Sequence, residues 1–336
     1  MDNATIQAKI QKGWTPNRYL TNMSMAYFQD SPFVARSIFP MCPVQLSSSH
    51  FYTFSKGDLA RDNVGRKPSH GKVATAVLGH LDNMYSCKVD QVIVGIDQID
   101  TLNYTRTGAP GMIDPRRAKT RFIAEQMNLH LDAMFAKNFF STGVWENEKT
   151  GVTGTPGANQ FYKFNDANFD AVNFFDDLKR EMKREARRAP NVLALGVEAF
   201  QALKNNPDII ERVKFSGSTV NPAIVNENVL AQLFGIDRIV VLDSTYNAAS
   251  EGNAPDMQYI CDAKGALLCY VTPSPQIDTP SAGYIFTWDM LGNGSYIATD
   301  QYEGEPGTHT EFIEGLLSVD MKVCAQDMAV YLSECC

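Results

Sequence analysis

The stretch SKGDLARDNVGRKPSHGKVATAVLG (residues 55–79) decides how the rest of this sequence is interpreted. From Gly57 to Gly79 it holds four glycines, one proline and four basic residues, and it has no helical period. Loops longer than about 12–15 residues are uncommon inside compact domains and are usually either functional or disordered. The question is therefore what holds such a long polar segment in place.

The sequence on both sides of this loop alternates as strands do. HFYTFSK before the loop places Tyr52 and Phe54 on one face, and NMYSCKVDQVIVG after it does the same with Tyr85 and Cys87. Such alternation is typical of half-buried strands. We therefore expect residues 49–95 to form one extended hairpin loop that reaches away from the body of the protein.

The composition is that of a globular protein, with 336 residues, 44% hydrophobic and 20% charged, which leaves room for two modest domains. The net charge of −8 argues against tight nonspecific wrapping of nucleic acid, which needs a strong positive field. The sequence shows neither a membrane span nor the apolar core of a signal peptide. Seven scattered cysteines without a CxxC pair indicate a reducing cytoplasm.

Two helices stand out, followed by an α/β half. Asp114-Pro115 opens a helix of about residues 115–140, and a second helix runs from about 170 to 189, ending at Pro190. From residue 191 onward, buried strand patterns such as NVLALG alternate with short helices. The apolar stripes of the two long helices are Ile123, Met127, Leu131, Met134 and Phe135 in the first, and Phe174, Leu178 and Met182 in the second. The fold class is mixed α+β.

The sequence contains no recognisable catalytic constellation. It lacks GxGxxG after a strand, GxxxxGK[ST] and GxSxG, so dinucleotide, P-loop and common hydrolase sites are not indicated. His70 and His80 could hold a metal in the loop, but lone loop histidines are more often solvated. Cys335 and Cys336 are expected to be an inert, exposed pair. We therefore predict no catalytic residue, no cofactor, no metal and no enzymatic activity.

The run KREMKREARR (residues 179–188) is the strongest nucleic-acid candidate. The alternative is a solvated helix face, in which Glu181 and Glu185 neutralise Arg184 and Arg188 at helical spacing. No aromatic residues are interspersed for stacking on bases. The sequence favours the solvated face.

An apolar N-terminal segment and a long loop that both leave the core need partners to bury against. Five stretches, in order along nearly the whole chain, resemble the major capsid proteins of tailed bacteriophages, which share the Hong Kong 97-type shell fold. The stretches are FVARSIFPMCPV (residues 33–44), HFYTFSKGDLARDN, PRRAKTRFIAEQMNLHLDAMFAKNFF, APNVLALGVEAFQALKNNPDI and NVLAQLFGIDRIVVLDS.

This resemblance implies an N-terminal arm, an extended loop, a spine helix, and peripheral and axial domains. The implied divisions are 1–48 for the arm, 49–95 for the extended hairpin loop, 96–189 for the peripheral domain with its spine helix, 190–305 for the axial domain, and 306–336 for a C-terminal return to the peripheral domain.

The implied function is a structural head protein that assembles into an icosahedral shell around double-stranded DNA, without reading the DNA sequence. Its partners would be its own copies in pentamers and hexamers, together with scaffolding, portal and decoration proteins, and no membrane. It would be made in the host cytoplasm and reside in the virion capsid. The alternatives are an encapsulin-like compartment shell, a tail or baseplate structural protein, and a soluble hydrolase or transferase with an atypical site.

Six residues are predicted to contact neighbouring subunits. The loop from Gly57 to Gly79 has a net charge of +2, opposite in sign to the whole chain, so we expect it to dock on an acidic surface of the adjacent subunit. The predicted contact residues are Arg61, Arg66, Lys67 and Lys72 in the loop, and Phe33 and Phe39 in the arm. Lys56, Lys67 and Lys72 lie in the loop, but no covalent crosslink is predicted.

Overall fold

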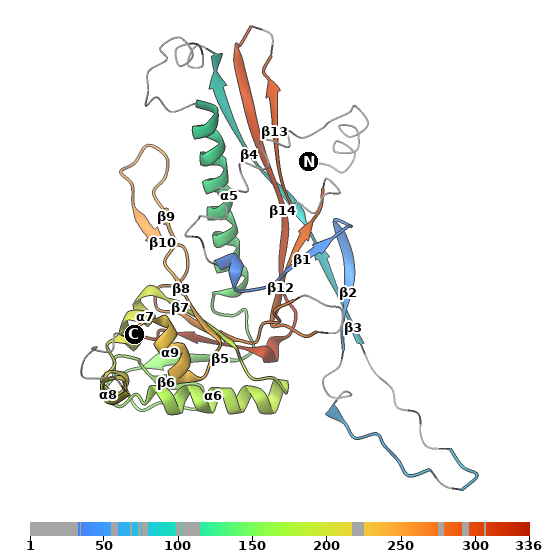
Figure 1. The fold of residues 1–336 in the computed structure, drawn as a ribbon, viewed down its shortest axis with the longest axis vertical. Coiled ribbons are helices and arrows are strands. Elements are labelled where there is room, and N and C mark those ends of the chain that lie inside the picture. The colour runs from blue at the N-terminus through green and yellow to red at the C-terminus, as the bar shows by residue number, and fades with distance from the viewer. Residues whose placement is uncertain are drawn as a thin grey trace.

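The computed structural model describes residues 33, 35–54, 60–67, 69–72, 75, 80–98, 102, 115–216, 225–274, 279–290, 296–305 and 307–336. Most of the predicted arm, and Lys56 in the loop, lie outside these residues. The described residues form two sheets, a long helix against one of them, and a hairpin that projects from the body (Figure 1).

The first sheet is long and is built around one central strand. β14 (Thr310–Val323) pairs antiparallel with β4 (Lys88–Asp97) along one edge. Along its other edge it pairs with β13 (Ile297–Glu303) and then with β12 (Gly283–Trp288). β1 (Met41–Val44) joins parallel to β12 at the border of the sheet. The C-terminal apolar run thus returns to the first half of the chain, as its β-leaning pattern predicts.

The predicted spine helix exists and covers one face of this sheet. α5 (Pro115–Phe139) runs along β4 and β14 (Figure 1). Met134 is only half-buried. A Cβ added to Gly315 on β14 would lie 2.4 Å from Met127 Cε and 2.5 Å from Ile123 Cγ2, so the missing side chain lets the helix approach closely. The rest of the predicted stripe is buried: Ile123, Met127, Leu131 and Phe135.

The second sheet has six strands in the order β6-β5-β15-β11-β7-β8 and mixes parallel and antiparallel pairs. Its strands are β5 (Glu148–Val152), β6 (Gln160–Tyr162), β7 (Val192–Gly196), β8 (Arg238–Leu242), β11 (Ala266–Cys269) and β15 (Ala329–Ser333). The accompanying elements are α6 (Ala171–Ala186), α7 (Val197–Lys204), α8 (Pro207–Ser216), α9 (Glu227–Phe234), the paired strands β9 (Thr245–Asn247) and β10 (Met257–Tyr259), and the 3-10 turns η1 (Ala35–Ser37) and η2 (Gln326–Met328).

The second predicted helix is correct at its start and shorter at its end. The side chain of Asp170 caps α6 at its N-terminus. The helix ends at Ala186 because Arg187 adopts a left-handed conformation with φ 59°, before Pro190 is reached. Phe175 is fully buried, whereas Phe174, which the predicted stripe includes, is only half-buried.

Both sheets combine strands from distant parts of the chain, and the domain divisions at residues 190 and 305 remain predictions. β12 and β13, which lie within 190–305, pair in the long sheet with β4 and β14. β5, β6 and β15, which lie outside that range, pair in the six-stranded sheet. Pairing depends on contacts between distant residues, which the order of segments does not reveal. One continuous apolar core links the two sheets.

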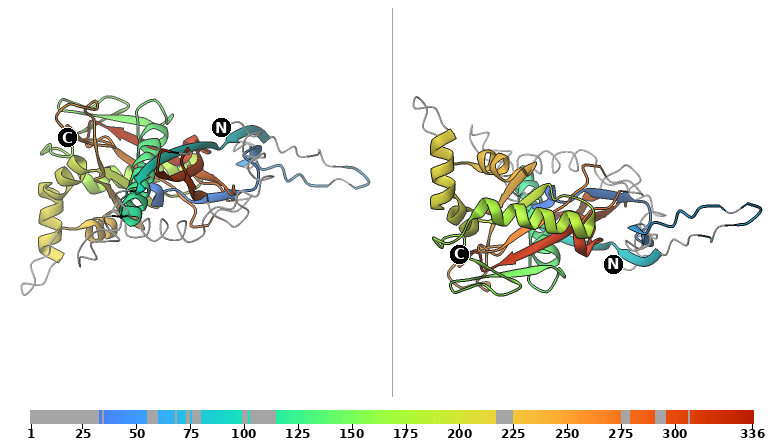
Figure 2. Two further views of the ribbon diagram at one scale, coloured as in Figure 1. Left: turned by 90° about the horizontal axis from the view of Figure 1, so that it is seen from above. Right: turned by 90° about the horizontal axis from the view of Figure 1, so that it is seen from below.

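The base of the predicted hairpin is confirmed. β2 (Ser48–Phe54) and β3 (His80–Ser86) pair antiparallel from Ser48 opposite Ser86 to Phe54 opposite His80. Beyond this ladder, the described residues 60–67 extend away from both sheets (Figures 1 and 2). The hairpin is therefore a short two-stranded base that carries a long excursion.

Candidate assembly surface

The C-terminal end of the predicted arm is built into the chain's own core. Ile38 and Phe39 are buried, and the ring centroid of Phe39 lies 6.1 Å from that of Phe135 and 4.4 Å from that of Phe139 on α5. Phe39, predicted to contact a neighbouring subunit, is only 2% exposed and instead anchors its own arm. Phe33 is half-buried, so part of its side chain reaches the surface.

Polar contacts hold the same segment to both halves of the molecule. Arg238, the first residue of β8, donates to the carbonyl oxygens of Ser37 (2.7 Å) and Ile38 (3.0 Å). Arg36 donates to Oδ1 of Asn128 on α5 (3.2 Å). The segment thus ties the spine helix to the six-stranded sheet before it enters the long sheet as β1.

A buried carboxyl lies at this junction. Asp132, one helical turn after Asn128, is 1% exposed, and its Oδ2 accepts a 2.5 Å hydrogen bond from Oγ of Ser244, beyond the end of β8. Its Oδ1 has no hydrogen-bond partner among the described residues. Burial raises the pKa of Asp132 to about 6, although the Ser244 hydrogen bond and the charge of Arg36 lower it. Sequence reasoning missed this residue, because a charged side chain on an apolar helix stripe gives no sign of its partner.

The base of the hairpin rests on the border of the long sheet through a second apolar cluster. Tyr85 stacks on Phe286 of β12 with centroids 4.6 Å apart, and Phe51 approaches the same ring at 5.2 Å. Cys87 is buried in the same cluster as Tyr85, which confirms the prediction that these two residues share one face. From β2, Phe51 packs in this cluster. The side chains of the predicted pair, Tyr52 and Phe54, lie outside the described residues.

The far part of the hairpin offers its side chains to solvent. The four predicted basic residues, Arg61, Arg66, Lys67 and Lys72, are all exposed. Val64 lies among them and is 91% exposed. The backbone N–H of Val64 donates to Oδ1 of Asp62 (3.0 Å), which fixes the local turn that presents its side chain. The sequence signals Val64 only as an apolar residue inside a polar loop.

Other large apolar side chains are exposed elsewhere on the described surface, on the hairpin, α5, the long sheet, the β9–β10 pair and two connecting segments: Leu46, Met84, Ile93, Leu102, Phe122, Met257, Tyr259 and Tyr302. Single exposed apolar residues are ordinary, but those on projecting segments are placed to meet another molecule. The exposed surface therefore suits an assembly component.

Comparison with known proteins identifies the fold. No protein-family profile matches the chain. The chain is 23% identical over 262 residues to the major capsid protein of Burkholderia phage BcepMu, covering 75% of each chain. A phage-related protein from Bordetella bronchiseptica RB50 matches with TM-score 0.70 and 16% identity over 96% of this chain and 98% of that one. The putative capsid protein of an E. coli CFT073 prophage matches with TM-score 0.52 and 12% identity, over 95% of this chain and 99% of that one. The chain has the fold of phage capsid proteins.

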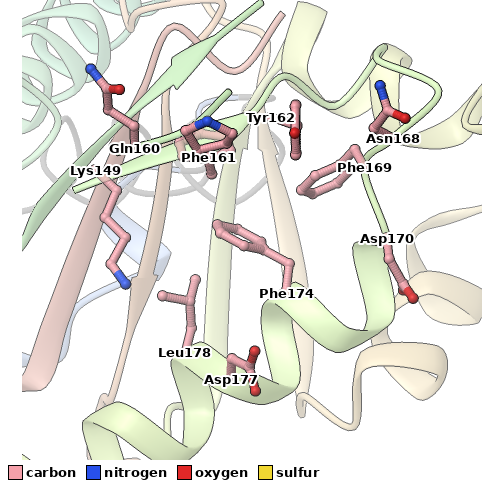
Figure 3. Close-up of a pocket in the computed structure, with 11 residues that line it drawn as sticks. Lys149, Gln160, Phe161, Tyr162, Asn168, Phe169, Asp170, Phe174, Asp177 and Leu178 are labelled. Atoms are coloured by element: carbon pink, nitrogen blue, oxygen red, sulfur yellow. The ribbon is translucent and has the colours of Figure 1, made fainter. Parts of the chain in front are cut away.

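One open pocket of the protein lies against α6. It measures about 320 Å³ and lies between α6 and the β5–β6 region, lined by phenylalanines (Figure 3). Lys149 points toward α6 (Figure 3). Its Nζ donates to Oε2 of Glu181 on α6 at 2.7 Å. Asp170 caps α6, and Asp177 pairs with Arg180. Each of these three charged lining groups thus has a partner within the chain.

The C-terminus corrects one expectation. Cys335 is fully buried, and Cys336 is half-buried, so the predicted exposed pair does not exist. The N–H of Cys335 donates to the carbonyl of Lys264 (2.9 Å), and the Cys335 carbonyl accepts from the N–H of Phe164 (2.7 Å). Burial raises the pKa of Cys335 well above its usual value, so this thiol is unreactive.

Neither metal-binding clusters nor membrane-spanning helices occur in the described part of the chain. Nowhere in it do three or more histidine, cysteine, aspartate or glutamate side chains gather in a way that could hold an ion. Among the same residues, no helix combines the length and apolar character that crossing a membrane requires.

Proposed function

We propose that this protein is the major head subunit of a tailed phage, with the Hong Kong 97-like arrangement of arm, extended loop, spine helix, peripheral domain and axial domain. The observation that carries the proposal is the identity to the BcepMu major capsid protein, which spans three quarters of both chains. The arm segment that ties both sheets together and the projecting hairpin support it.

In this proposal the partners are chiefly copies of the same chain. Contacts between different surface patches close into rings when the rotation permits, and rings of five and six subunits tile a shell. Scaffolding, portal and decoration proteins complete the head, which encloses double-stranded DNA without reading its sequence. Assembly takes place in the host cytoplasm, and the product is the virion capsid.

The exposed basic residues of the hairpin are proposed to dock on an acidic surface of the adjacent subunit. Reversing both Arg66 and Lys67 to glutamate should reduce the yield of particles while leaving the free energy of unfolding of the subunit within about 0.5 kcal/mol, because both side chains are exposed. Sedimentation of lysates measures the particles, and urea titration of unassembled subunit measures stability. The control reverses Lys119 and Lys204, which are exposed on α5 and α7. Normal particles from the hairpin variant would refute the docking.

The proposed function is tested by expressing the chain with its genomic neighbours and imaging the product by electron microscopy. Closed shells that protect DNA from nuclease are expected. Closed shells that hold protein cargo in place of DNA would favour the compartment-shell alternative, and rings without closure would favour a tail component. A monomer of about 37 kDa that persists at high concentration would overturn the proposal.

A further inference from the structure

The solvent face of α6 carries a row of cations. Its buried stripe is Ala171, Phe175, Leu178, Met182 and Ala186. The opposite face presents Arg180, Lys183 and Arg184 at helical spacing i, i+3 and i+4, and Arg187 continues the row at i+7. Arg188 follows directly, and all five are exposed. α6 lies across the underside of the molecule with this face open (Figure 2). We call these five residues the basic stripe.

The neutralisation expected from the sequence forms only in part. Glu181 turns away from the stripe and bonds Lys149 on β5 at 2.7 Å. Glu185 lies 3.5 Å from its neighbour Arg184, a weak exposed pair. Arg188 sits over the ring of Tyr270, 5.5 Å from its centroid. The acidic residues interleaved in the sequence are therefore poor partners for the stripe in space.

The stripe retains a net positive charge on a strongly exposed surface. The side chains of Arg180 and Arg184 are 79% and 76% exposed. Asp177 pairs with Arg180, and Asp176 of the same turn pairs with Lys179 outside the stripe. The stripe gathers five cations on one helix of a chain whose total charge is −8. A concentrated positive row on an acidic protein attracts a polyanion locally without making the whole surface adhesive.

We propose that the basic stripe contacts the phosphate backbone of duplex DNA, an inference that rests on the proposed head function because that function supplies the DNA. From Arg180 to Arg187 the row spans about 10 Å, at 1.5 Å per residue. Duplex DNA presents one charge per ~1.7 Å of its axis, so several phosphates lie within reach of the row. Arginine and lysine contacts to phosphate carry no sequence information. The stripe thus gives α6 a defined orientation, with its solvent face toward the packaged genome.

The test is the salt dependence of binding between the unassembled full-length protein and a fluorescein-labelled 30-base-pair duplex. Each lost phosphate contact lowers the slope of log Kd against log salt concentration by about 0.9. The Lys183→Gln/Arg184→Gln/Arg188→Gln variant should therefore lose about 2.7 units of slope. Between 0.05 and 0.2 M salt, the wild-type Kd should rise about 40-fold more than that of the variant. The matched control, Lys88→Gln/Lys119→Gln/Lys204→Gln, removes equal charge from exposed positions elsewhere.

An unchanged slope in the stripe variant, or an equal loss in the control, would overturn the inference. So would poly-glutamate binding more tightly than the duplex at equal charge concentration, because that result would point to an acidic protein partner. Particle formation, scored by electron microscopy of the same variants, is independent of these outcomes. Failure of the DNA contact and failure of the head function are therefore distinguishable.

Discussion

At the junction of α5, the arm segment and the six-stranded sheet, the charged form of Asp132 lowers the stability of the folded state. Its pKa rises from 3.8 to about 6 on folding, chiefly because burial disfavours the charged form. Below pH 3.8 the side chain is protonated in both the folded and the unfolded state, so it does not lower the free energy of unfolding. As the pH rises from 3.8 toward 6 the unfolded state loses the proton more readily, so the free energy of unfolding falls, and the full loss is reached above pH 6. The groups facing it are Ser244, Arg36 and Asp243.

Replacing Asp132 with asparagine should remove this pH dependence. The difference in unfolding free energy between variant and wild type should move in favour of the variant by about 2–3 kcal/mol between pH 3.5 and pH 7. Urea titrations of the unassembled subunit across that range measure it, with the exposed Asp237→Asn as the control. A difference that stays constant with pH would show that Asp132 is charged at no cost in the folded state.

At the scale of elements, the arm segment behaves as a fixed part of the core. Phe39→Ala should lower the free energy of unfolding by about 3–5 kcal/mol, because it empties a site between Phe135 and Phe139. Phe39→Leu should cost less, and Leu46→Ala, at an exposed position just after β1, should cost under about 0.5 kcal/mol. Urea titration gives all three values. A small loss for Phe39→Ala would mean that the segment is held chiefly by Arg238.

The helices and strands differ in how far they can be predicted from the sequence. The length and apolar period of α5 were sufficient to place it, because a helix satisfies its hydrogen bonds locally. The contact of Phe51 with Phe286 could not be predicted, because it depends on where β12, more than 200 residues later in the chain, lies in the sheet. The sheet membership of β12, β13 and β15 depends on pairing across the whole chain. The basic run on α6 seemed neutral because its acids are close in sequence, whereas Glu181 has a better partner on β5.

At the scale of the whole molecule, the most exposed of the large apolar residues that the structure describes lies on the projecting hairpin. Val64, on the projecting hairpin, is 91% exposed, and the proposed head function makes a neighbouring subunit the molecule that would bury it. Fully burying a valine contributes about 1.5–3 kcal/mol, and 1.4 kcal/mol is a tenfold change in an equilibrium constant.

Val64→Ser should therefore raise the critical concentration for particle assembly about tenfold or more, while Val64→Ile should leave it near the wild-type value. Sedimentation of the purified protein over a concentration series measures the threshold. The unfolding free energy of the unassembled subunit should stay within about 0.5 kcal/mol in both variants, because the side chain makes almost no contact within its own chain. If the serine variant assembles at the wild-type threshold, the hairpin tip is not buried between subunits, and the basic residues around it must act without an apolar anchor.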